Sequence, residues 1–361
     1  MQVWLEAATE RVSCRRHGVV VAGVPWARHD AGHTYAFDQT VAWLVTRMAK
    51  SAVSELMRTS WRTVGNIMAR VWADLDDPTT RLAGLTRIGI DEVSYKRGYR
   101  YLVVVVDHNS HQLVWAGEGK TMATLDRFFD LLGEQGCAQI SHVSADGADW
   151  ISKVVSRRCP TAVRAADPFH VVQWANDALG TVRIQAWNQA REQAKLEPPR
   201  STGWAARTQD RPAADLVKGL KGARFALWRN PEDLTEKQQA KLDWIAVADR
   251  RLYRAYLLKE RLRIIFTMNV ADAETALDHW VAAARRSRIE AFVTLQRRIT
   301  RYRAEILAAI EHQISNGPIE SVNNKIRVLT RIAYGYRNAA ALIALAMLAL
   351  SGPKLALPGR T

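Results

Sequence analysis

The segment from Thr86 to Val106, TRIGIDEVSYKRGYRYLVVVV, decides the fold, because its hydrophobic period changes there from that of helices to that of strands. Residues Thr86 to Val93 alternate between apolar and polar side chains and predict a first strand. Tyr99 to Val106 is a nearly continuous β-branched run, which is typical of a buried central strand. A third strand is expected at Gln112 to Gly117, so the three should form an antiparallel meander.

The pattern downstream alternates between helix and strand. A helix is expected at Thr124 to Leu132, a strand at Gln139 to Ala145, a crossing helix, and a strand at Ala162 to Ala166. Three antiparallel strands followed by helix, strand, helix and strand is the order of an RNase H-like fold. From about Val171 the pattern is helical throughout. We therefore predict an α/β RNase H-like catalytic core with a long all-helical insertion, preceded by an α-helical helix-turn-helix region.

The helix-turn-helix prediction rests on the pattern that begins at Asp38. Two short helical segments lead to the turn Arg58 to Ser60, and Ser60 is a good N-cap for a helix from Trp61 to Trp72. The turn lacks the usual glycine, and a plain helical bundle is the alternative. Three outward residues have side chains that suit phosphates and base edges: Arg62, Thr63 and Asn66.

These patterns divide the chain into segments. Asp76 to Thr80 reads as a linker between the helix-turn-helix region and the core. The expected domains are a remnant of a zinc-binding type of N-terminal segment (1–37), the helix-turn-helix region (38–80), the first part of the core (81–175), the all-helical insertion (176–312), the catalytic and closing helices of the core (313–352) and a tail (353–361).

The composition favours a DNA-binding globular protein. Of 361 residues, 48% are hydrophobic, so intrinsic disorder is not expected. Lys and Arg number 51 against 36 Asp and Glu, which gives a net charge of +15. A surface this basic attracts polyanions, most commonly nucleic acid. A merely basic protein, or a coding bias toward arginine, is the alternative.

Cysteine usage and apolar runs indicate the compartment. Cys14, Cys137 and Cys159 are too few and too widely spaced for a disulfide framework, which suits a reducing cytosol. The sequence opens with no secretory signal pattern. The longest apolar run, Ala339 to Leu350, is shorter than the roughly 20 residues that span a bilayer. We expect a soluble cytoplasmic protein with no membrane partner.

The N-terminal segment carries the spacing of a metal-ligand pair. Cys14 and His17 form a Cys-x-x-His pair, and His29 and His33 could complete a site. No second pair with the usual spacing follows, so structural zinc is not expected. The alternative is a short β-ribbon from Gly18 to Trp26.

Three carboxylates occupy positions that suggest chemistry. Asp91 lies on the first strand, Asp146 ends the fourth, and Glu320 lies in the first turn of a helix that follows the breaker Asn316-Gly317-Pro318. Carboxylates brought together need neutralising charge. Two Mg²⁺ ions, which prefer oxygen ligands, can activate an attacking oxygen and stabilise a leaving one. Four polar residues are expected to share the face of Glu320: Asn323, Asn324, Arg327 and Arg331.

The sequence resembles the DDE-type transposases of bacterial insertion sequences, in particular the ISL-three group. The resemblance covers the chain from about Cys14 to Gly352. Its motifs are Gly89-Ile90-Asp91-Glu92, Val143-Ser144-Ala145-Asp146, Asp167-Pro168-Phe169-His170, the run from Ser315 to Arg327, and Ala333-Tyr334-Gly335-Tyr336-Arg337-Asn338. The run around Glu320 is the most specific of these motifs.

This resemblance implies a site and a reaction. Asp91, Asp146 and Glu320 match the DDE positions, which would bind two Mg²⁺ or Mn²⁺ ions, cleave DNA at the inverted-repeat ends of an insertion element and transfer the strand to target DNA. Asp167 is the rival to Asp146 as second ligand. Auxiliary residues would be Asp167, His170, Asn316, Asn323 and Asn324, and further DNA contacts Arg327, Arg331 and Arg337. The enzyme would act as a homo-oligomer on DNA, associated with the nucleoid.

Other functions remain open at this point. A nuclease of the same fold would cut DNA without strand transfer, whereas a DNA-binding regulator, or an inactive remnant, would bind element ends without metal. A structural basic protein would bind DNA regardless of sequence. The family usually opens with a cysteine-rich zinc-binding segment, of which only Cys14 and His17 remain. In the helical insertion, Lys218, Lys221 and Arg224 are candidate phosphate contacts, and Trp228 and Trp244 are expected in the core.

Overall fold

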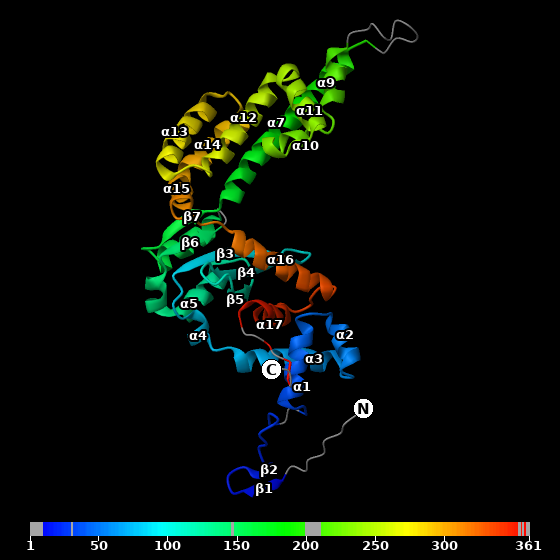
Figure 1. Ribbon diagram of the computed structural model, residues 1–361, viewed down its shortest axis with the longest axis vertical. Coiled ribbons are helices and arrows are strands. Elements are labelled where there is room, and N and C mark those ends of the chain that lie inside the picture. Colours follow the sequence, from blue (N-terminus) through cyan, green and yellow to red (C-terminus); the bar gives the residue numbers. More distant parts are fainter. Residues whose placement is uncertain are drawn as a thin grey trace. The chain divides into compact units, whose positions relative to one another are not determined.

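The computed structural model describes residues 10–29, 32–145, 148–198, 211–352, 355 and 357–358. The chain forms two compact units. The first contains the chain up to Ile140, Arg157–Cys159 and everything from Gly317 onward, and the second contains Ser141–Ser156 and Pro160–Asn316. Figure 1 colours the elements along the sequence, so that the first unit contains both the blue and the red ends of the chain.

The first unit contains the predicted meander of antiparallel strands. Its strands are β3 (Arg87–Lys96), β4 (Arg100–Asp107) and β5 (Leu113–Glu118), with β4 pairing to both of the others. The first strand runs beyond its predicted end at Val93. Gly98 and Tyr99 both adopt positive φ in the connecting turn, so the chain reverses tightly and pairing continues from Ser94 to Lys96.

Helices from two distant parts of the sequence cover this meander. α16 (Gly317–Ile332) and α17 (Ala339–Leu350) share a hydrophobic core with β3, β4 and β5. α5 (Met122–Gln139) packs against β5. Gly133 has a non-helical backbone (φ 73°, ψ 169°) that kinks α5 one residue after its predicted end at Leu132. The helix resumes after the kink, and for this reason the next strand begins later than predicted.

The helix-turn-helix region consists of α1 (Tyr35–Val45), α2 (Lys50–Leu56) and α3 (Trp61–Leu75). The predicted cap is present, because the Ser60 side chain accepts a hydrogen bond of 3.0 Å from the backbone N–H of Thr63. The core of this region is not made by its own helices alone. Four residues from α16 and α17 complete the cluster: Leu329, Ala344, Leu345 and Leu348.

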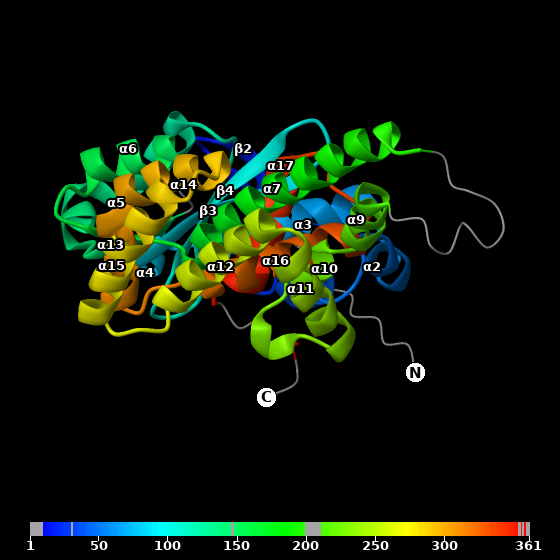
Figure 2. The ribbon, with the colours of Figure 1, turned by 90° about the horizontal axis from the view of Figure 1, so that it is seen from above.

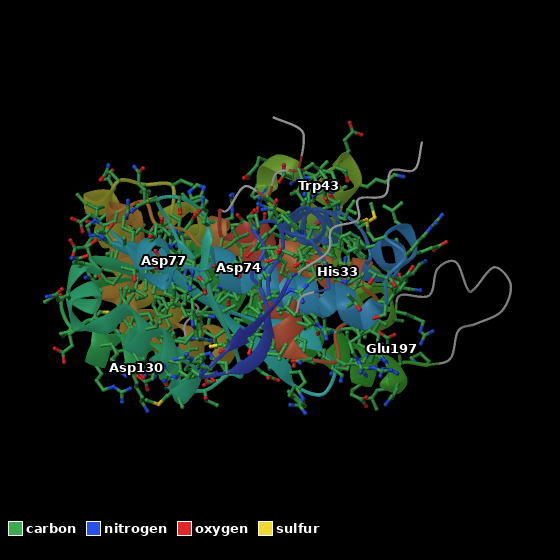
Figure 3. All side chains as sticks on the ribbon, turned by 90° about the horizontal axis from the view of Figure 1, so that it is seen from below. His33, Trp43, Asp74, Asp77, Asp130 and Glu197 are labelled. Carbon is green, nitrogen blue, oxygen red and sulfur yellow. The ribbon has the colours of Figure 1, made fainter. Side chains whose placement is uncertain are left out.

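A buried ion cluster joins the chain before α1 to α3. Asp38 is fully buried and accepts hydrogen bonds from Arg28 (2.5 Å) and from Arg70 (2.9 and 3.0 Å). Arg28 also contacts Asp74, an exposed residue of α3 labelled in Figure 3. The two guanidinium groups thus neutralise one buried carboxylate. They also hold the segment before α1, and α1 itself, against α3.

Two local predictions for this unit are wrong. The expected linker at Asp76–Thr80 contains the start of a helix, α4 (Pro78–Leu82), which begins because the Asp77 side chain caps it and Pro78 fits its first turn. The expected ribbon at Gly18–Trp26 lies earlier in the sequence. β1 (Arg11–Cys14) pairs antiparallel with β2 (Gly18–Val21).

The second unit begins with a parallel strand pair. β6 (His142–Ala145) and β7 (Val163–Ala166) are connected by α6 (Asp149–Arg158), and Ala145 pairs with Ala166 at the end of both strands. Parallel strands end at the same edge, so the C-terminal ends of β6 and β7 lie side by side.

The rest of the second unit is helical wherever it is described, as predicted. Its elements are α7 (Pro168–Leu196), α9 (Pro212–Leu220), α10 (Arg224–Leu227), the 3₁₀ turn η1 (Pro231–Asp233), α11 (Glu236–Ala248), α12 (Arg250–Ile265), α13 (Val270–Arg286), α14 (Glu290–Arg301) and α15 (Arg303–Glu311).

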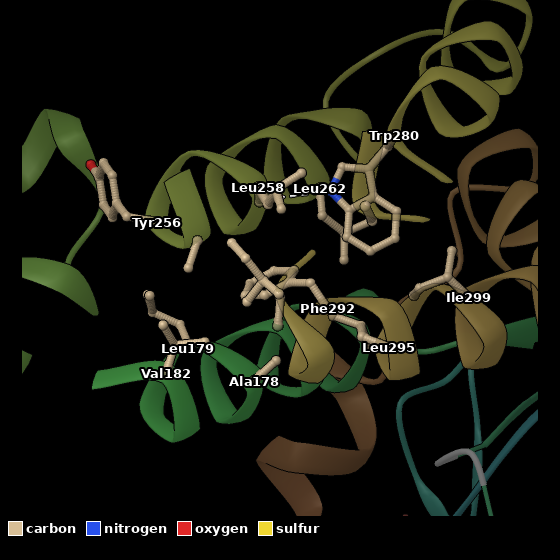
Figure 4. Packing of buried hydrophobic residues seen from close by; sticks show 14 of the residues in the cluster. Ala178, Leu179, Val182, Tyr256, Leu258, Leu262, Trp280, Phe292, Leu295 and Ile299 are labelled. Carbon is tan, nitrogen blue, oxygen red and sulfur yellow. Dashed lines mark hydrogen bonds between the residues drawn. The ribbon is translucent and has the colours of Figure 1, made fainter. Parts of the chain in front are cut away.

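Long-range packing holds this helical block together. α7 lies beside α12 and α14 (Figure 2). Large side chains from these helices and α13 interdigitate in one core, among them Leu179, Leu262, Trp280 and Phe292 (Figure 4). Glu197, labelled in Figure 3, accepts backbone hydrogen bonds of 2.7 and 3.2 Å from the first turn of α9. Among the helices described in the two units, none combines the length and apolar character needed to cross a membrane.

Candidate active site and nucleic-acid interface

Asp91 lies on β3 and is held from two directions. Its Oδ1 accepts a hydrogen bond of 2.7 Å from the backbone N–H of Glu92, and its Oδ2 accepts one of 2.7 Å from Nδ2 of Asn323. Asn323 belongs to α16 and is only 1% exposed. The helix that carries Glu320 therefore also orients the carboxylate of Asp91.

The position of Asn323 corrects the sequence analysis, which placed it on the polar face of α16 with Glu320. Asn323 lies instead on the buried face, with Ile319, Val322 and Ile326. Residues 319, 323 and 326 follow one another at helical spacings of four and three, so they share a stripe. An asparagine within this stripe is stable because its amide has the carboxylate of Asp91 as a partner.

Gly89 allows α16 to approach β3 closely. A Cβ atom at this position would lie 2.0 Å from Cδ1 of Ile319, a distance that real Cβ atoms do not show. The Ile319 side chain is itself fully buried and has little room to move. The glycine of the Gly89-Ile90-Asp91-Glu92 motif thus has a packing role that the sequence analysis missed.

Glu320 is exposed in the first turn of α16, as predicted. It lines a surface groove of about 670 Å³. Besides Glu320, the groove is lined by residues of α16, by residues at the end of α17, and by one residue at the end of α1, including Thr46, Ser321, Asn324, Lys325 and Val328. This carboxylate is therefore accessible to an ion or to a large polyanionic substrate.

Asp167 follows β7 directly and caps α7. Its Oδ2 lies 2.7 Å from Nδ1 of His170, while its Oδ1 accepts from the backbone N–H groups of Phe169 (3.4 Å) and Asn316 (3.3 Å). The residue is only 5% exposed. The predicted auxiliary residues Asp167, His170 and Asn316 are thus brought together in the second unit.

Asn316 also connects this cluster to β6. Ser144 donates a hydrogen bond of 2.5 Å from its hydroxyl to Oδ1 of Asn316. Asn316 is 5% exposed, and no described atom accepts a hydrogen bond from its Nδ2. The break between α15 and α16, predicted from Asn316-Gly317-Pro318, is therefore fixed by side-chain contacts to both strands.

Asp146 lies outside the described residues, one position after β6 ends at Ala145. Within the residues described, no group of three or more His, Cys, Asp or Glu side chains is arranged to hold a metal ion. The assignment of the second ligand to Asp146 or to Asp167 therefore stays a prediction.

Asp149 starts α6 and also bonds to the end of α14. Its Oδ1 accepts hydrogen bonds from the hydroxyl of Tyr302 (2.9 Å) and from Arg301 (3.0 Å). The hydrogen bond from Tyr302 is the main reason why the pKa of Asp149 lies below its ordinary value. This carboxylate anchors the C-terminal end of α14 and is engaged in structural contacts.

The predicted DNA contacts of α3 lie at its N-terminal end. Arg62 and Asn66 are exposed, whereas Thr63 is half-buried and its hydroxyl lies 2.8 Å from that of Ser60. Arg58 supplies the left-handed conformation (φ 49°) for which the turn has no glycine. The region therefore presents an arginine and an asparagine to solvent at the start of the second of the paired helices.

The arginines of the C-terminal region are also exposed. Arg327 donates a hydrogen bond of 2.9 Å to Oδ1 of Asn324, and both residues lie on the solvent side of α16. Arg331, near the end of α16, and Arg337, before α17, are exposed as well. These exposed guanidinium groups are compatible with phosphate contacts.

At the N-terminus, Cys14 and His17 face each other with Sγ and Nδ1 3.6 Å apart. His33 stacks on Phe37 with 4.7 Å between ring centroids. The pair therefore exists, and the four-ligand arrangement considered for zinc is not found among the residues described.

One expectation for the helical insertion is wrong. Trp228 was expected in the core, but it is 43% exposed beside Arg224. It lies just beyond α10, a helix too short to turn all of its large residues inward. Trp244 is half-buried against the core, as expected.

Comparison with known proteins identifies the class. A transposase family model matches residues 88–346, and a model described as the helix-turn-helix domain of transposase family ISL3 matches residues 24–72. The chain belongs to the ISL3 family of insertion-sequence transposases.

Curated relatives agree with this assignment. The chain is 58% identical over its whole length to proteins from two strains of Mycobacterium tuberculosis described as the transposase for insertion sequence element IS1557, and it covers 81% of their length. It is 30% identical over 303 residues, 83% of the chain, to the transposase for insertion sequence element IS1001 of Bordetella parapertussis, of which it covers 69%.

These matches establish the function in outline. The protein is an insertion-sequence transposase with a helix-turn-helix DNA-binding region and a DDE catalytic domain that cleaves DNA and transfers strands, and membership of the family implies dependence on a divalent metal. The alternative of a regulator or an inactive remnant is not favoured.

Proposed function

We propose that Asp91, Asp146 and Glu320 are the catalytic carboxylates of an RNase H-like core. The meander β3–β5, the parallel pair β6–β7 and the intervening helices occur in the order expected of that fold. The bond from Asn323 to Asp91 carries the proposal, because it ties the strand of the first carboxylate to the helix of the third.

The donor chemistry suits Mg²⁺ or Mn²⁺. The three proposed ligands offer carboxylate oxygens, which hard divalent cations prefer, and Asp91 and Glu320 are both accessible to solvent. A pair of such ions, when bound, would activate the attacking oxygen and stabilise the leaving oxygen at phosphorus. Asn323 keeps one oxygen of Asp91 engaged, which leaves the carboxylate a restricted range of orientations.

The proposed reaction has two steps. In the first, water attacks the phosphorus at the element end, and the broken P–O bond leaves a 3′-hydroxyl. In the second, that 3′-hydroxyl attacks a phosphodiester of target DNA, forms a new P–O bond and displaces the 3′-oxygen of the target strand. Neither step requires a covalent bond between protein and DNA.

The auxiliary residues would act by positioning. Asp167 and His170 bond to each other, and Asn316 bonds to Asp167 and Ser144, so this cluster would fix the ends of β6 and β7 next to Asp146. We assign Asp167 to this structural role because three donors already engage its oxygens. Asn324 would act on the exposed face of α16, at the groove beside Glu320.

DNA binding is assigned to two exposed sets. Arg62, Thr63 and Asn66 would contact the inverted repeat from the start of α3, where residues of a recognition helix reach base edges. Arg327, Arg331 and Arg337 would contact phosphates. The enzyme would act in the bacterial cytoplasm, as a homo-oligomer on paired ends. Light scattering with and without end DNA would test the oligomeric state.

The decisive experiment is cleavage and strand transfer on a labelled element-end duplex with Mg²⁺ and with Mn²⁺. Asp91→Ala, Asp146→Ala and Glu320→Ala should each abolish both steps while retaining binding to the duplex. Asp130→Ala, an exposed carboxylate on α5, is the control. If Asp146→Ala remains active and Asp167→Ala does not, Asp167 is the second ligand.

A further inference from the structure

A basic and aromatic surface lies on the helical insertion, away from the proposed catalytic residues, and includes two of the candidate phosphate contacts, Lys221 and Arg224. The segment from Lys218 to Arg229 contains four basic residues and no acidic one. The exposed charged and aromatic residues from Lys221 onward, which we call the α10 surface, are Lys221, Arg224, Phe225, Trp228 and Arg229. Phe225 is 63% exposed and Trp228 is 43% exposed. Large aromatic rings exposed together on a cationic surface favour an interaction site.

The surface is built on a fixed base. Ala223, Ala226 and Leu227 are at most 1% exposed and point into the helical core. Gln238 of α11 donates a hydrogen bond of 3.1 Å to the backbone carbonyl of Phe225. Trp228 lies against Gly180 of α7, where an added Cβ would be 3.6 Å from the indole. The rings are therefore displayed from an ordered backbone, which lowers the entropy lost on binding.

Arg224 joins the two rings into one platform. Its guanidinium carbon lies 5.2 Å from the ring centroid of Phe225 and 4.8 Å from that of Trp228. A guanidinium beside aromatic faces offers both stacking and charge.

The two acidic residues that directly follow the segment along the chain have partners of their own. Glu232 accepts hydrogen bonds of 2.8 and 2.9 Å from Arg263. Asp233 accepts a long one of 3.3 Å from Asn230. These carboxylates are directed to other groups, so the positive charge of Lys221, Arg224 and Arg229 remains available to a polyanion.

We propose that the α10 surface binds DNA at unpaired bases. Phosphates alone would be satisfied by lysine and arginine, and an intact duplex hides the faces of its bases. Exposed aromatic rings interleaved with basic residues instead match unpaired bases, which stack on the rings while the cations contact the backbone. A single-stranded or distorted segment of DNA, as arises when a strand is cut, has this chemistry.

The test compares binding of a labelled single-stranded oligonucleotide and of a labelled duplex of the same sequence by fluorescence anisotropy. It uses the full chain without divalent metal, so that cleavage plays no part. The double variant Phe225→Leu/Trp228→Leu should weaken single-strand binding about five- to a hundredfold, the range expected for losing stacking on one base. Duplex binding should change less than twofold.

A further variant separates the contribution of charge to DNA binding from that of the aromatic rings. Arg224→Gln should weaken single-strand binding and lower the slope of log affinity against log salt by about 0.7, the value for one single-strand phosphate contact. The matched controls are Tyr99→Leu, a ring 90% exposed on the β3–β4 turn, and Arg285→Gln, exposed at the end of α13. Neither should change binding, and circular dichroism should show that every variant is folded.

Two outcomes would overturn the proposal. Equal losses on single strand and duplex would mean that the surface contributes only charge. Unchanged single-strand binding, with a lower mass of the double variant in sedimentation, would mean that the rings form a contact between copies of the chain. Because the assay requires no catalysis, a failure here would not bear on the catalytic carboxylates.

Discussion

Asn323 donates a hydrogen bond to Asp91 across 232 residues of sequence, with 2.7 Å between Nδ2 and Oδ2. The bond joins a helix near the end of the chain to the first strand of the meander. In the proposed site it is an outer contact of a metal ligand, and contacts of that kind orient the ligand and tune its affinity for the metal.

Replacing Asn323 should therefore impair catalysis more than folding. Asn323→Ala should lower the rate of DNA cleavage about 10- to 100-fold and raise the Mg²⁺ concentration needed for half-maximal rate. Asn188→Ala, at an exposed asparagine of α7 outside the proposed site, is the matched control. If both variants respond equally to Mg²⁺, Asn323 does not act through Asp91.

Gly89→Ala should disturb the contact between β3 and α16. The new Cβ would overlap Ile319, and forcing a methyl group into a packed core costs about 1–3 kcal/mol of unfolding free energy. Gly23→Ala, where nothing lies within 4 Å, should have no such effect. Adding Ile319→Val removes the overlapping methyl and should restore part of the stability in urea denaturation. If Ile319→Val restores no stability, the overlap with Ile319 is not the cause of the destabilisation.

Asp38→Ala should destabilise the helix-turn-helix region strongly. It leaves the guanidinium groups of Arg28 and Arg70 without their buried partner, and breaking such a cluster costs about 3–5 kcal/mol. Asp74→Ala removes an exposed partner of Arg28 and should cost less than about 1 kcal/mol. Thermal unfolding, monitored by circular dichroism, measures the stability of both variants. Similar losses of stability in the two variants would show that the burial of Asp38 does not determine its contribution.

Stability should fall in mild acid because of His108. Burial, together with the positive charge of Arg87, lowers the pKa of this imidazole to about 4. The unfolded chain takes up the proton near pH 6.5, so the folded state loses stability as the pH falls from about 6.5 toward 4. Between pH 7 and pH 5 the loss should be roughly 1–2 kcal/mol. Urea unfolding of the wild type and of His108→Gln at both pH values isolates the contribution of His108. The variant should lose less unfolding free energy between pH 7 and pH 5 than the wild type does.

Arg62→Ala should weaken binding to the element-end duplex in a salt-dependent way. If Arg62 contacts a phosphate, the slope of log affinity against log salt should fall by about 0.9. If it reads a base edge, discrimination between correct and mutated ends should fall instead. Arg97→Ala, on the β3–β4 turn, is the control. Unchanged affinity and unchanged discrimination would remove Arg62 from the interface.

Local rules made several features predictable from the sequence. Ser60 caps α3 and Asp107 closes its turn through the backbone N–H groups of Asn109 and Ser110, as their residue types indicate. The meander follows from β-branched runs separated by turn residues. Each of these features depends on a few neighbouring positions, for which propensity and capping are informative.

Features that depend on distant partners were not predictable in the same way. Asn323 is polar by type and is therefore predicted on the polar face with Glu320, although its partner Asp91 allows its burial. Trp228 is apolar by type and was assigned to the core, although Arg224 and Phe225 accompany it at the surface. Gly89 matters only because Ile319 lies against it. In each case the deciding contact comes from outside the local pattern.

The shared core of the helix-turn-helix region and α17 has a consequence for synthesis. Val64 and Ile67 of α3 lie in the same cluster as Leu345 and Leu348 of α17, which are translated much later. The DNA-reading helices therefore lack part of their core until α17 has left the ribosome. We expect nascent chains and fragments that lack α17 to bind element ends poorly, so that only polypeptides containing α17 compete for the DNA.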